Sequence, residues 1–215
     1  MKRLVPEIPR KGWLLLTVLV SAALIAGCST RPPGERATHY LLTEQPTGPE
    51  ATATGGERLL RVRRIELARY LDVEGIVMQT SDVAVRSARN HLWAEDLAAQ
   101  LHRDLVQRLS KQLEDVRVLD PDQQLRATER EIMQLTVTID RFQGRFDGYA
   151  VVGGEWRLLD SEGEIQAGER FQREQALTQD GYPALVESLK DAWTSVVADI
   201  ADGLGGAWAG DGLAD

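Results

Sequence analysis

Few side chains in this 215-residue sequence could perform chemistry, and they are widely spaced. Cys28 is the only cysteine, which excludes a disulfide framework within the chain and a metal site built from several cysteines. His91 and His102 are 11 residues apart, whereas a metal-binding pair on one helical face normally has i,i+4 spacing. We therefore predict no metal site, and solvated or capping roles for the histidines, His39 included.

The motifs that bind nucleotides or activate a nucleophile are absent from the sequence. There is no Gly-x-x-x-x-Gly-Lys-Ser/Thr loop to hold phosphates, and no Gly-x-Ser-x-Gly turn to present a reactive serine. The glycine-rich run at 203–206 does not follow a predicted strand, so it is not a dinucleotide-binding fingerprint. We predict that the protein is not an enzyme and has no catalytic residues and no cofactor.

The composition indicates an acidic globular protein. The chain has 25 Lys+Arg against 33 Asp+Glu, and 43% of its residues are hydrophobic, so bulk disorder and a nucleic-acid partner are both disfavoured. One segment departs from this balance, because five arginines fall within 12 residues: Arg58, Arg61, Arg63, Arg64 and Arg69. They are interpreted either as outward charges that protect a strand edge or as a basic docking patch for phosphate headgroups or an acidic partner.

The N-terminal residues have the layout of a secretory signal peptide. Lys2, Arg3, Arg10 and Lys11 are followed by an apolar run that starts at Trp13 and ends in the small residues just before Cys28. The run is about 15 residues long, short of the ~20 that span a bilayer comfortably. We predict that residues 1–27 are a signal peptide.

The end of this segment resembles a bacterial lipobox, Leu24-Ile-Ala-Gly-Cys28. The resemblance implies cleavage before Cys28, a diacylglycerol on its sulfur and an acyl chain on the new amino group. Ser29 stands where Asp usually means inner-membrane retention in enterobacterial lipoproteins, so outer-membrane sorting is implied, with the body in the periplasm. The alternative interpretation of Cys28 is a lone buried thiol in an uncleaved anchor helix.

Two amphipathic helices and several strands are predicted in the remainder, after a short polar tether at 28–38. Leucines every four residues from Leu97 to Leu113 indicate a helix over 92–113, with Asn90 as its cap, and a second apolar pattern indicates a helix over 182–204. Strands are predicted at 39–42, 58–67, 76–80, 83–86, 116–119, 131–142, 149–160 and 165–177. The last of these is polar and is expected at an edge.

These elements predict a single α/β or α+β domain over 39–204 and a flexible Gly-rich tail over 205–215. The long hairpins at 131–177 require an antiparallel part of the sheet, and the Leu-rich helix between two strands requires a crossover. The second predicted hairpin turn contains Gly163, which is free to adopt a positive φ.

Several sequence pieces occur in an order that resembles the PqiC/YmbA-type lipoproteins, the auxiliary component of ABC-type intermembrane transport systems. The pieces are His39-Tyr-Leu-Leu42, Arg69-Tyr-Leu-Asp72, Gly75-Ile-Val-Met-Gln79, Asn90-His-Leu-Trp-Ala-Glu-Asp-Leu97, Val137-Thr-Ile-Asp-Arg-Phe142, Gly154-Glu-Trp-Arg-Leu158 and Gly181-Tyr-Pro-Ala-Leu-Val186. The resemblance covers roughly residues 28–204.

The resemblance implies a three-layer α/β sandwich with a mixed, partly antiparallel sheet. It also implies a non-catalytic periplasmic lipoprotein beside an MCE-domain protein, an integral permease and an ATPase, in a system that moves lipids or other hydrophobic molecules. The body would dock this assembly to a membrane and could also form a homo-oligomer. Two alternatives stay open: a lipid- or solute-binding lipoprotein with its own pocket, and a structural lipoprotein of outer-membrane assembly.

Overall fold

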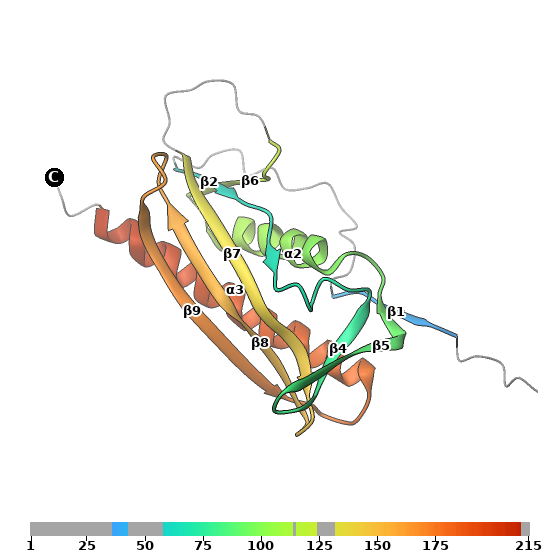
Figure 1. Cartoon of the computed structure of the whole chain (residues 1–215). Coiled ribbons are helices and arrows are strands. Elements are labelled where there is room, and N and C mark those ends of the chain that lie inside the picture. Colours follow the sequence, from blue (N-terminus) through green and yellow to red (C-terminus); the bar gives the residue numbers. More distant parts are fainter. Residues whose placement is uncertain (1–35, 43–57, 114, 124–131, 212–215) are drawn as a thin grey trace, which may run out of the picture. The chain divides into compact units, whose positions relative to one another are not determined.

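The computed structural model describes residues 36–42, 58–113, 115–123 and 132–211 (Figure 1). The predicted signal peptide, Cys28 and most of the predicted tether lie outside these residues. The elements in chain order are β1 (Thr38–Tyr40), β2 (Arg58–Val62), β3 (Glu66–Leu67), β4 (Gly75–Ser81), β5 (Ala84–Trp93), α2 (Leu97–Gln112), β6 (Val116–Leu119), β7 (Ile132–Arg145), β8 (Tyr149–Leu159), β9 (Ile165–Ala176) and α3 (Tyr182–Asp211).

The sheet is mixed and is organised around the long strand β7. One edge of β7 pairs antiparallel with β8, which pairs antiparallel with β9. The other edge pairs in parallel with three strands in succession, β2, β3 and β4. Beyond these, β6 pairs in parallel with β2, β5 pairs antiparallel with β4, and β1 pairs in parallel with β5.

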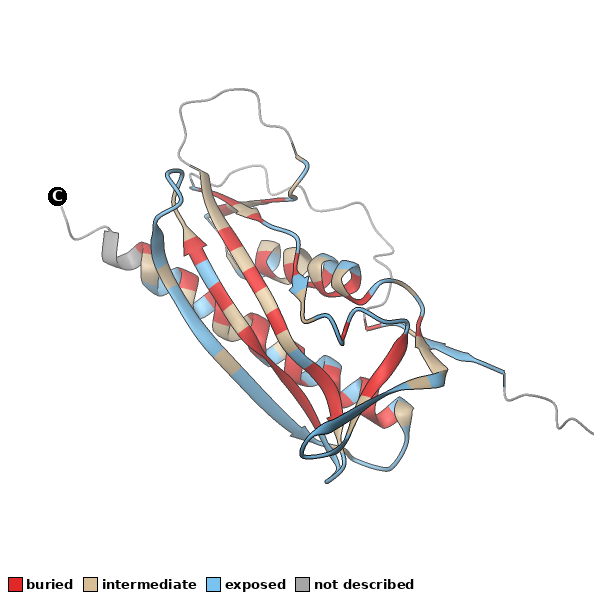
Figure 2. Ribbon diagram, in the orientation of Figure 1, coloured by how far each residue is buried: buried red, intermediate tan, exposed pale blue. Residues whose placement is uncertain are grey.

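Alternation of apolar and polar residues explains the central strands. Leu135, Val137 and Ile139 on β7 are all buried, and the residues between them are less so. Every second residue of a strand faces the same side, so this pattern sends one face into the core. Figure 2 shows the resulting red bands along β7 and β8, beside the mostly exposed strand β9. The sequence prediction of an exposed edge strand at 165–177 is therefore confirmed.

Both helices contribute to one apolar core. On α2 the leucines at 97, 101, 105 and 109 are buried, and α3 packs against β7, β8 and β9. Trp193 of α3 is among the largest fully buried side chains. The mixed α/β class with two main helices is confirmed, and the open sheet is consistent with the predicted sandwich.

The start of α2 lies later than the sequence predicts. Residues through Trp93 extend β5 because Trp93 is in register with Tyr40 on β1. The helix begins at Leu97, and its cap is Asp96, whose Oδ1 accepts a hydrogen bond from the Ala99 amide at 2.8 Å. The predicted cap Asn90 lies in β5, so that prediction was wrong.

The C-terminal helix, in contrast, ends later than predicted, at Asp211 rather than near Leu204. A Cβ on Gly203 would lie 2.5 Å from Cζ2 of Trp156, so glycine there lets the indole pack directly on the helix. Further along, Trp208 is buried, with the Arg58 guanidinium 5.8 Å from its ring centroid. Tertiary packing thus continues a helix through glycines that disfavour it locally.

One turn and one break in a strand can also be compared with the sequence predictions. Gly163, in the β8–β9 turn, has a φ of 90°, which confirms its predicted positive value. The strand predicted over 58–67 is two strands, because the chain between β2 and β3 departs from regular pairing while the Arg63 amide still donates to the Leu135 carbonyl at 2.8 Å.

Candidate functional site

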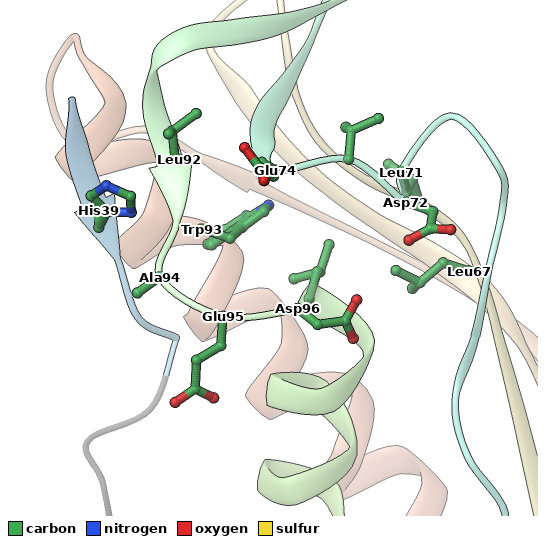
Figure 3. Close-up of a pocket in the computed structure, with 12 residues that line it drawn as sticks. His39, Leu67, Leu71, Asp72, Glu74, Leu92, Trp93, Ala94, Glu95 and Asp96 are labelled. Atoms are coloured by element: carbon green, nitrogen blue, oxygen red, sulfur yellow. The ribbon is translucent and has the colours of Figure 1, made fainter.

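A pocket of about 470 Å³ opens where the β3–β4 connection faces the end of β5 and the start of α2 (Figure 3). Its two sides come from segments far apart in sequence, which the β4–β5 pairing brings together. The lining residues are His39, Leu67, Leu71, Asp72, Val73, Glu74, Leu92, Trp93, Ala94, Glu95, Asp96 and Leu97.

The floor of the pocket is apolar and belongs to the core. Leu71, Trp93 and Leu97 are each at most 6% exposed, and the Trp93 ring lies 6.0 Å from the Phe142 ring, centroid to centroid. Leu71 anchors one side and Leu97, on the first turn of α2, the other. Since these residues hold the sheet against the helix, the floor is a fixed surface and not a mobile gap.

Trp93 also presents a polar atom to the pocket. Its backbone amide donates to the Glu74 carbonyl at 2.7 Å, which ties the two sides together. Among the described residues, the indole N–H that is buried without a hydrogen-bond partner belongs to Trp193 on α3, which does not line this pocket. In Figure 3 the indole nitrogen of Trp93 points across the cavity toward the side formed by Leu71 and Glu74.

Four carboxylates surround the mouth of the pocket, and they differ in whether another group binds them. Glu95 pairs with Arg103 at 2.6 Å and is turned away from the cavity in Figure 3. Asp96 is the cap of α2. Asp72 and Glu74 are exposed, and neither has a cation within 4 Å in the described part of the chain. The mouth therefore holds two carboxylates whose charge no residue in that part neutralises.

Buried polar contacts hold the chain after β1 against this site. Gln100 accepts a hydrogen bond from the Leu42 amide and donates one to the Glu95 carbonyl, both at 2.9 Å. On β1 itself, the Tyr40 phenol oxygen lies 2.9 Å from His91 Nδ1, and burial followed by the neighbouring Tyr182 raises the pKa of Tyr40. A raised pKa keeps the phenol protonated, so its O–H is available for this hydrogen bond.

The five arginines of the predicted cluster have different partners. Arg58 contacts the end of α3, where its guanidinium donates to the Trp208 carbonyl at 3.4 Å. Arg61 donates to the Gln123 carbonyl, and Arg64 pairs with Asp122 at 2.7 Å, so both reach the turn after β6. Arg63 and Arg69 are exposed and without partners among the residues described. Any free basic surface in this set is therefore limited to these two side chains.

Within the described ranges, no group of three or more His, Cys, Asp or Glu side chains is arranged to hold a metal ion. No helix there is both long and apolar enough to cross a bilayer. His102 lies 3.4 Å from Asp120, and His91 stacks on Tyr182 with centroids 4.0 Å apart.

Sequence reasoning did not single out Asp72 and Glu74, and it interpreted Trp93 either as a core aromatic or as part of a groove for an acyl chain or a partner helix. The available signals were two short acidic runs, Asp72-Val-Glu74 and Glu95-Asp96, each beside a buried apolar residue. Their proximity depends on the antiparallel pairing of β4 with β5, which a single sequence does not specify.

Comparison with known proteins is decisive for the family. A profile described as "ABC-type transport auxiliary lipoprotein component" matches residues 40–201. The chain is 39% identical over 192 residues to the intermembrane transport lipoprotein PqiC of Escherichia coli, covering 89% of this chain and 96% of PqiC. The PqiC of Shigella flexneri gives the same values. The chain belongs to the ABC-type transport auxiliary lipoprotein family.

Solved structures of other proteins show the same fold. A crystal structure of an uncharacterized protein is 34% identical, with a TM-score of 0.63 over 78% of this chain and 98% of the other. A Xanthomonas campestris protein, 18% identical, has a TM-score of 0.60 over 76% and 92% of the two chains, and shows the fold alone. The predicted resemblance and the predicted role as a transport auxiliary lipoprotein are therefore confirmed.

Proposed function

We propose that this lipoprotein is a non-catalytic adaptor that docks an intermembrane transport assembly to a membrane through lipid on Cys28. The observation that carries the proposal is the 39% identity to PqiC, named an intermembrane transport lipoprotein, across nearly the whole chain. In this proposal residues 1–27 are cleaved, residues 28–38 tether the body and residues 39–204 form the docking domain. The segment 205–211, predicted as part of a flexible tail, belongs to α3 instead.

The anchor follows from the physics of acyl chains. A single chain binds a bilayer only marginally, since each buried CH₂ contributes about 0.8 kcal/mol, whereas three chains on one residue anchor it durably. Removal of residues 1–27 takes away four basic residues and one acidic residue, so the charge changes from −8 to −11. Because anionic headgroups repel such a body, the lipid must do most of the membrane binding.

The partners in this proposal are an MCE-domain protein and the permease and ATPase of the same system. A homo-oligomer could present several copies of the body to them. The test is photo-crosslinking in cells from exposed positions on the body, such as Val83 and Ile165. Capture of an MCE or permease subunit is expected, and capture of neither from any exposed position would contradict the proposal.

The proposed location is the outer membrane, with the body in the periplasm. Mass spectrometry of the native protein should find a triacylated Cys28 at the N-terminus, and Cys28→Ser should retain its leader and lose the lipid. Ser29→Asp should move the protein to the inner-membrane fraction. An unmodified Cys28 sulfur with the leader attached would refute the anchor, whereas unchanged fractionation of Ser29→Asp would refute only the sorting.

Two unpartnered arginines support a weaker proposal, that Arg63 and Arg69 form a small basic contact with headgroups or an acidic partner. Charge reversal of both should reduce crosslinking to transport subunits. Reversal of Arg64, which already pairs with Asp122, is the control and should have less effect. Equal effects from both variants would count against the contact.

A second candidate function is favoured by the pocket, whose apolar floor could hold part of a hydrophobic cargo. In that case lipid should co-purify with the acylated protein in excess of its own anchor. Extraction and mass spectrometry, with a Leu71→Asp variant for comparison, would separate a cargo-binding protein from an adaptor.

A further inference from the structure

Two hairpin turns of the sheet lie side by side at one end of the body. The cross-strand register places Val85, Gln79, Arg145, Tyr149 and Ala176 in one row, so β4, β5, β7, β8 and β9 all have an end there. The β4–β5 turn and the β7–β8 turn continue beyond this row, at the lower end of the molecule in Figure 1. The pairing of β4 with β7 therefore makes one surface of the two turns.

Exposed apolar side chains are concentrated on this surface. Of the eight large apolar side chains that are exposed in the described part of the chain, four lie here: Val83, Val85, Phe146 and Tyr149. Val83 is 97% exposed, in a two-residue turn closed by the Ser81–Ala84 pair. Tight turns favour Gly, Asn and Asp, and a valine that packs against almost nothing does not stabilise the fold. A gathering of exposed apolar groups indicates a contact with another apolar phase or molecule.

The same end is basic, although the protein is acidic. The hairpin segments 75–93 and 141–151 each contain two arginines and one aspartate, whereas the mature chain has a net charge of −11. Arg86 and Arg89 on β5 are exposed and have no partner among the described residues. Asp147 is already paired with Arg145 at 2.7 Å, which leaves Asp82 as the carboxylate of these segments without such a pair there.

We propose that these two turns lie against the surface of the bilayer that holds Cys28. Val83 and Phe146 enter the boundary between headgroups and acyl chains, and Arg86 and Arg89 lie beside the lipid phosphates. This inference rests on the lipid anchor of the proposed function and adds the face that the body turns toward the membrane. The acyl chains still supply most of the binding, and the turns fix the orientation.

The length of chain before β1 allows this contact. Thr38 is ten residues after Cys28, and ten residues reach at most about 35 Å. Thr38 is in register with His91 on β5, and Ala84, at the start of β5, is seven residues before His91. Seven strand residues span at most about 25 Å, so the turn at Val83 is within reach of a bilayer that holds Cys28.

A lipid surface matches this end better than a second copy of the chain does. Apolar side chains flanked by arginines are the composition of surfaces that bind at the membrane interface. In a two-fold dimer through this patch, the net positive hairpins of both copies would face each other and repel. A transport subunit is the competing partner, and the experiments below separate it from lipid.

The test uses the acylated full-length protein in vesicles of phosphatidylethanolamine and phosphatidylglycerol. Because Cys28 is the only cysteine and is acylated, Val83→Cys, Phe146→Cys or Ile165→Cys supplies the single free thiol for an NBD fluorophore. Phospholipid with a doxyl group near the headgroup quenches the fluorophores that enter the boundary. Ile165 is the control, because it is exposed but begins β9 at the opposite end of the sheet.

Quenching at positions 83 and 146 should be at least about threefold stronger than at position 165, since interfacial side chains lie about 5–10 Å into the boundary. With the fluorophore on Val85→Cys, Val83→Ser combined with Phe146→Ser should reduce quenching about threefold. Removal of two exposed apolar side chains elsewhere, Val73→Ser combined with Ile165→Ser, should change it less than about 1.5-fold.

The arginines are tested by the effect of anionic lipid. With the same fluorophore at position 85, phosphatidylglycerol should increase quenching, and Arg86→Gln combined with Arg89→Gln should remove about half or more of that increase. Arg64→Gln combined with Arg103→Gln removes the same charge from other surfaces, where both arginines are already paired, and should leave the increase unchanged.

Two outcomes would overturn the inference while leaving the proposed function intact. One is equal quenching at positions 83 and 165 in protein that is acylated and bound to vesicles. The other is a photo-crosslinker at position 83 that captures a transport subunit and no phospholipid in cells, which would identify the turns as a protein contact. An unmodified Cys28, in contrast, would refute the anchor and this inference together.

Discussion

Carboxylates at the pocket mouth and carboxylates on strands β7 to β9 have opposite surroundings. On the strands, Arg170 contacts Asp140 at 2.7 Å and Glu155 at 3.5 Å, and Arg157 contacts Glu155 at 2.7 Å. At the mouth, Asp72 has no such partner in the described stretches, and neither does Glu74. The acidic side chains are thus neutralised by arginines on one surface and lie without a cationic partner among the described residues on the other.

Arg145 neutralises two carboxylates on strands β7 to β9 and in the turn between them. Arg145 contacts Asp147 at 2.7 Å and Glu174 at 2.8 Å. Its hydrogen bonds lower the pKa of both carboxyls, and the two carboxylates raise the pKa of Arg145 above its ordinary value. These groups stabilise one another and are not free to recognise a ligand.

The largest expected effect lies beneath the mouth, where Trp93 is part of the core. Trp93→Ala should lower the free energy of unfolding by about 3–5 kcal/mol, because it removes a buried aromatic ring and leaves a cavity beside Phe142. Arg157→Ala, on the strands, should cost at most about 1 kcal/mol. Urea unfolding measures both, and a similar loss in the two variants would mean that the floor does not belong to the core.

The next largest loss of stability is expected at the buried side-chain amide of Gln100. Gln100→Ala removes the acceptor for the Leu42 amide and the donor to the Glu95 carbonyl, so it should cost about 1–3 kcal/mol. Gln112→Ala, at the exposed end of the same helix, is the control and should be within about 0.5 kcal/mol of the parent. If the two variants unfold at the same urea concentration, Gln100 does not hold the site.

The positions of strands β6 and β7 were predicted well from the sequence, because the alternation of apolar and polar residues is a local signal. Leu135, Val137 and Ile139 alternate with polar residues, and β7 lies where that pattern is found. The predicted strand at 116–119 coincides with β6. Helix ends were less predictable: Trp93 was assigned to the helix by its apolar neighbours, but pairing with β1 makes it a strand residue.

The pocket could not be predicted, because it depends on contacts between distant segments. The carboxylates of Asp72 and Glu74 resemble many exposed acidic residues, and only the structure shows that they lack partners in the described part of the chain. The five arginines illustrate the converse. Their clustering in sequence left two interpretations open, strand-edge protection or a basic docking patch, and only the structure shows that Arg58 and Arg64 contact different elements.

Acid should lower the stability of the protein by protonating the two carboxylates that pair with Arg145, those of Asp147 and Glu174. The pKa values of Asp147 and Glu174 lie below their ordinary 3.8 and 4.5, so the stability they contribute is present above those values and is lost as pH falls through the folded-state pKa. Arg145→Gln should therefore be less stable than the parent at neutral pH and should converge with it near pH ~2.

The measurement is the urea midpoint across that pH range. Arg141→Gln is the control, because Arg141 donates to the neutral amide of Gln172 rather than to a carboxylate. Parallel midpoints for the parent and Arg145→Gln at every pH would contradict the prediction.

The smallest effect on stability is expected for the carboxylates at the pocket mouth, and it tests whether they differ from the paired carboxylates on strands β7 to β9. Asp72→Asn combined with Glu74→Gln removes no ion pair within the described residues, so stability should change by less than about 0.5 kcal/mol. Asp140→Asn combined with Glu155→Gln removes the same charge but breaks contacts to Arg170 and Arg157, and should cost about 0.2–1 kcal/mol per pair. Urea unfolding of the two double variants should thus rank the mouth as the more tolerant surface. If both lose the same stability, the mouth carboxylates already have partners within the chain.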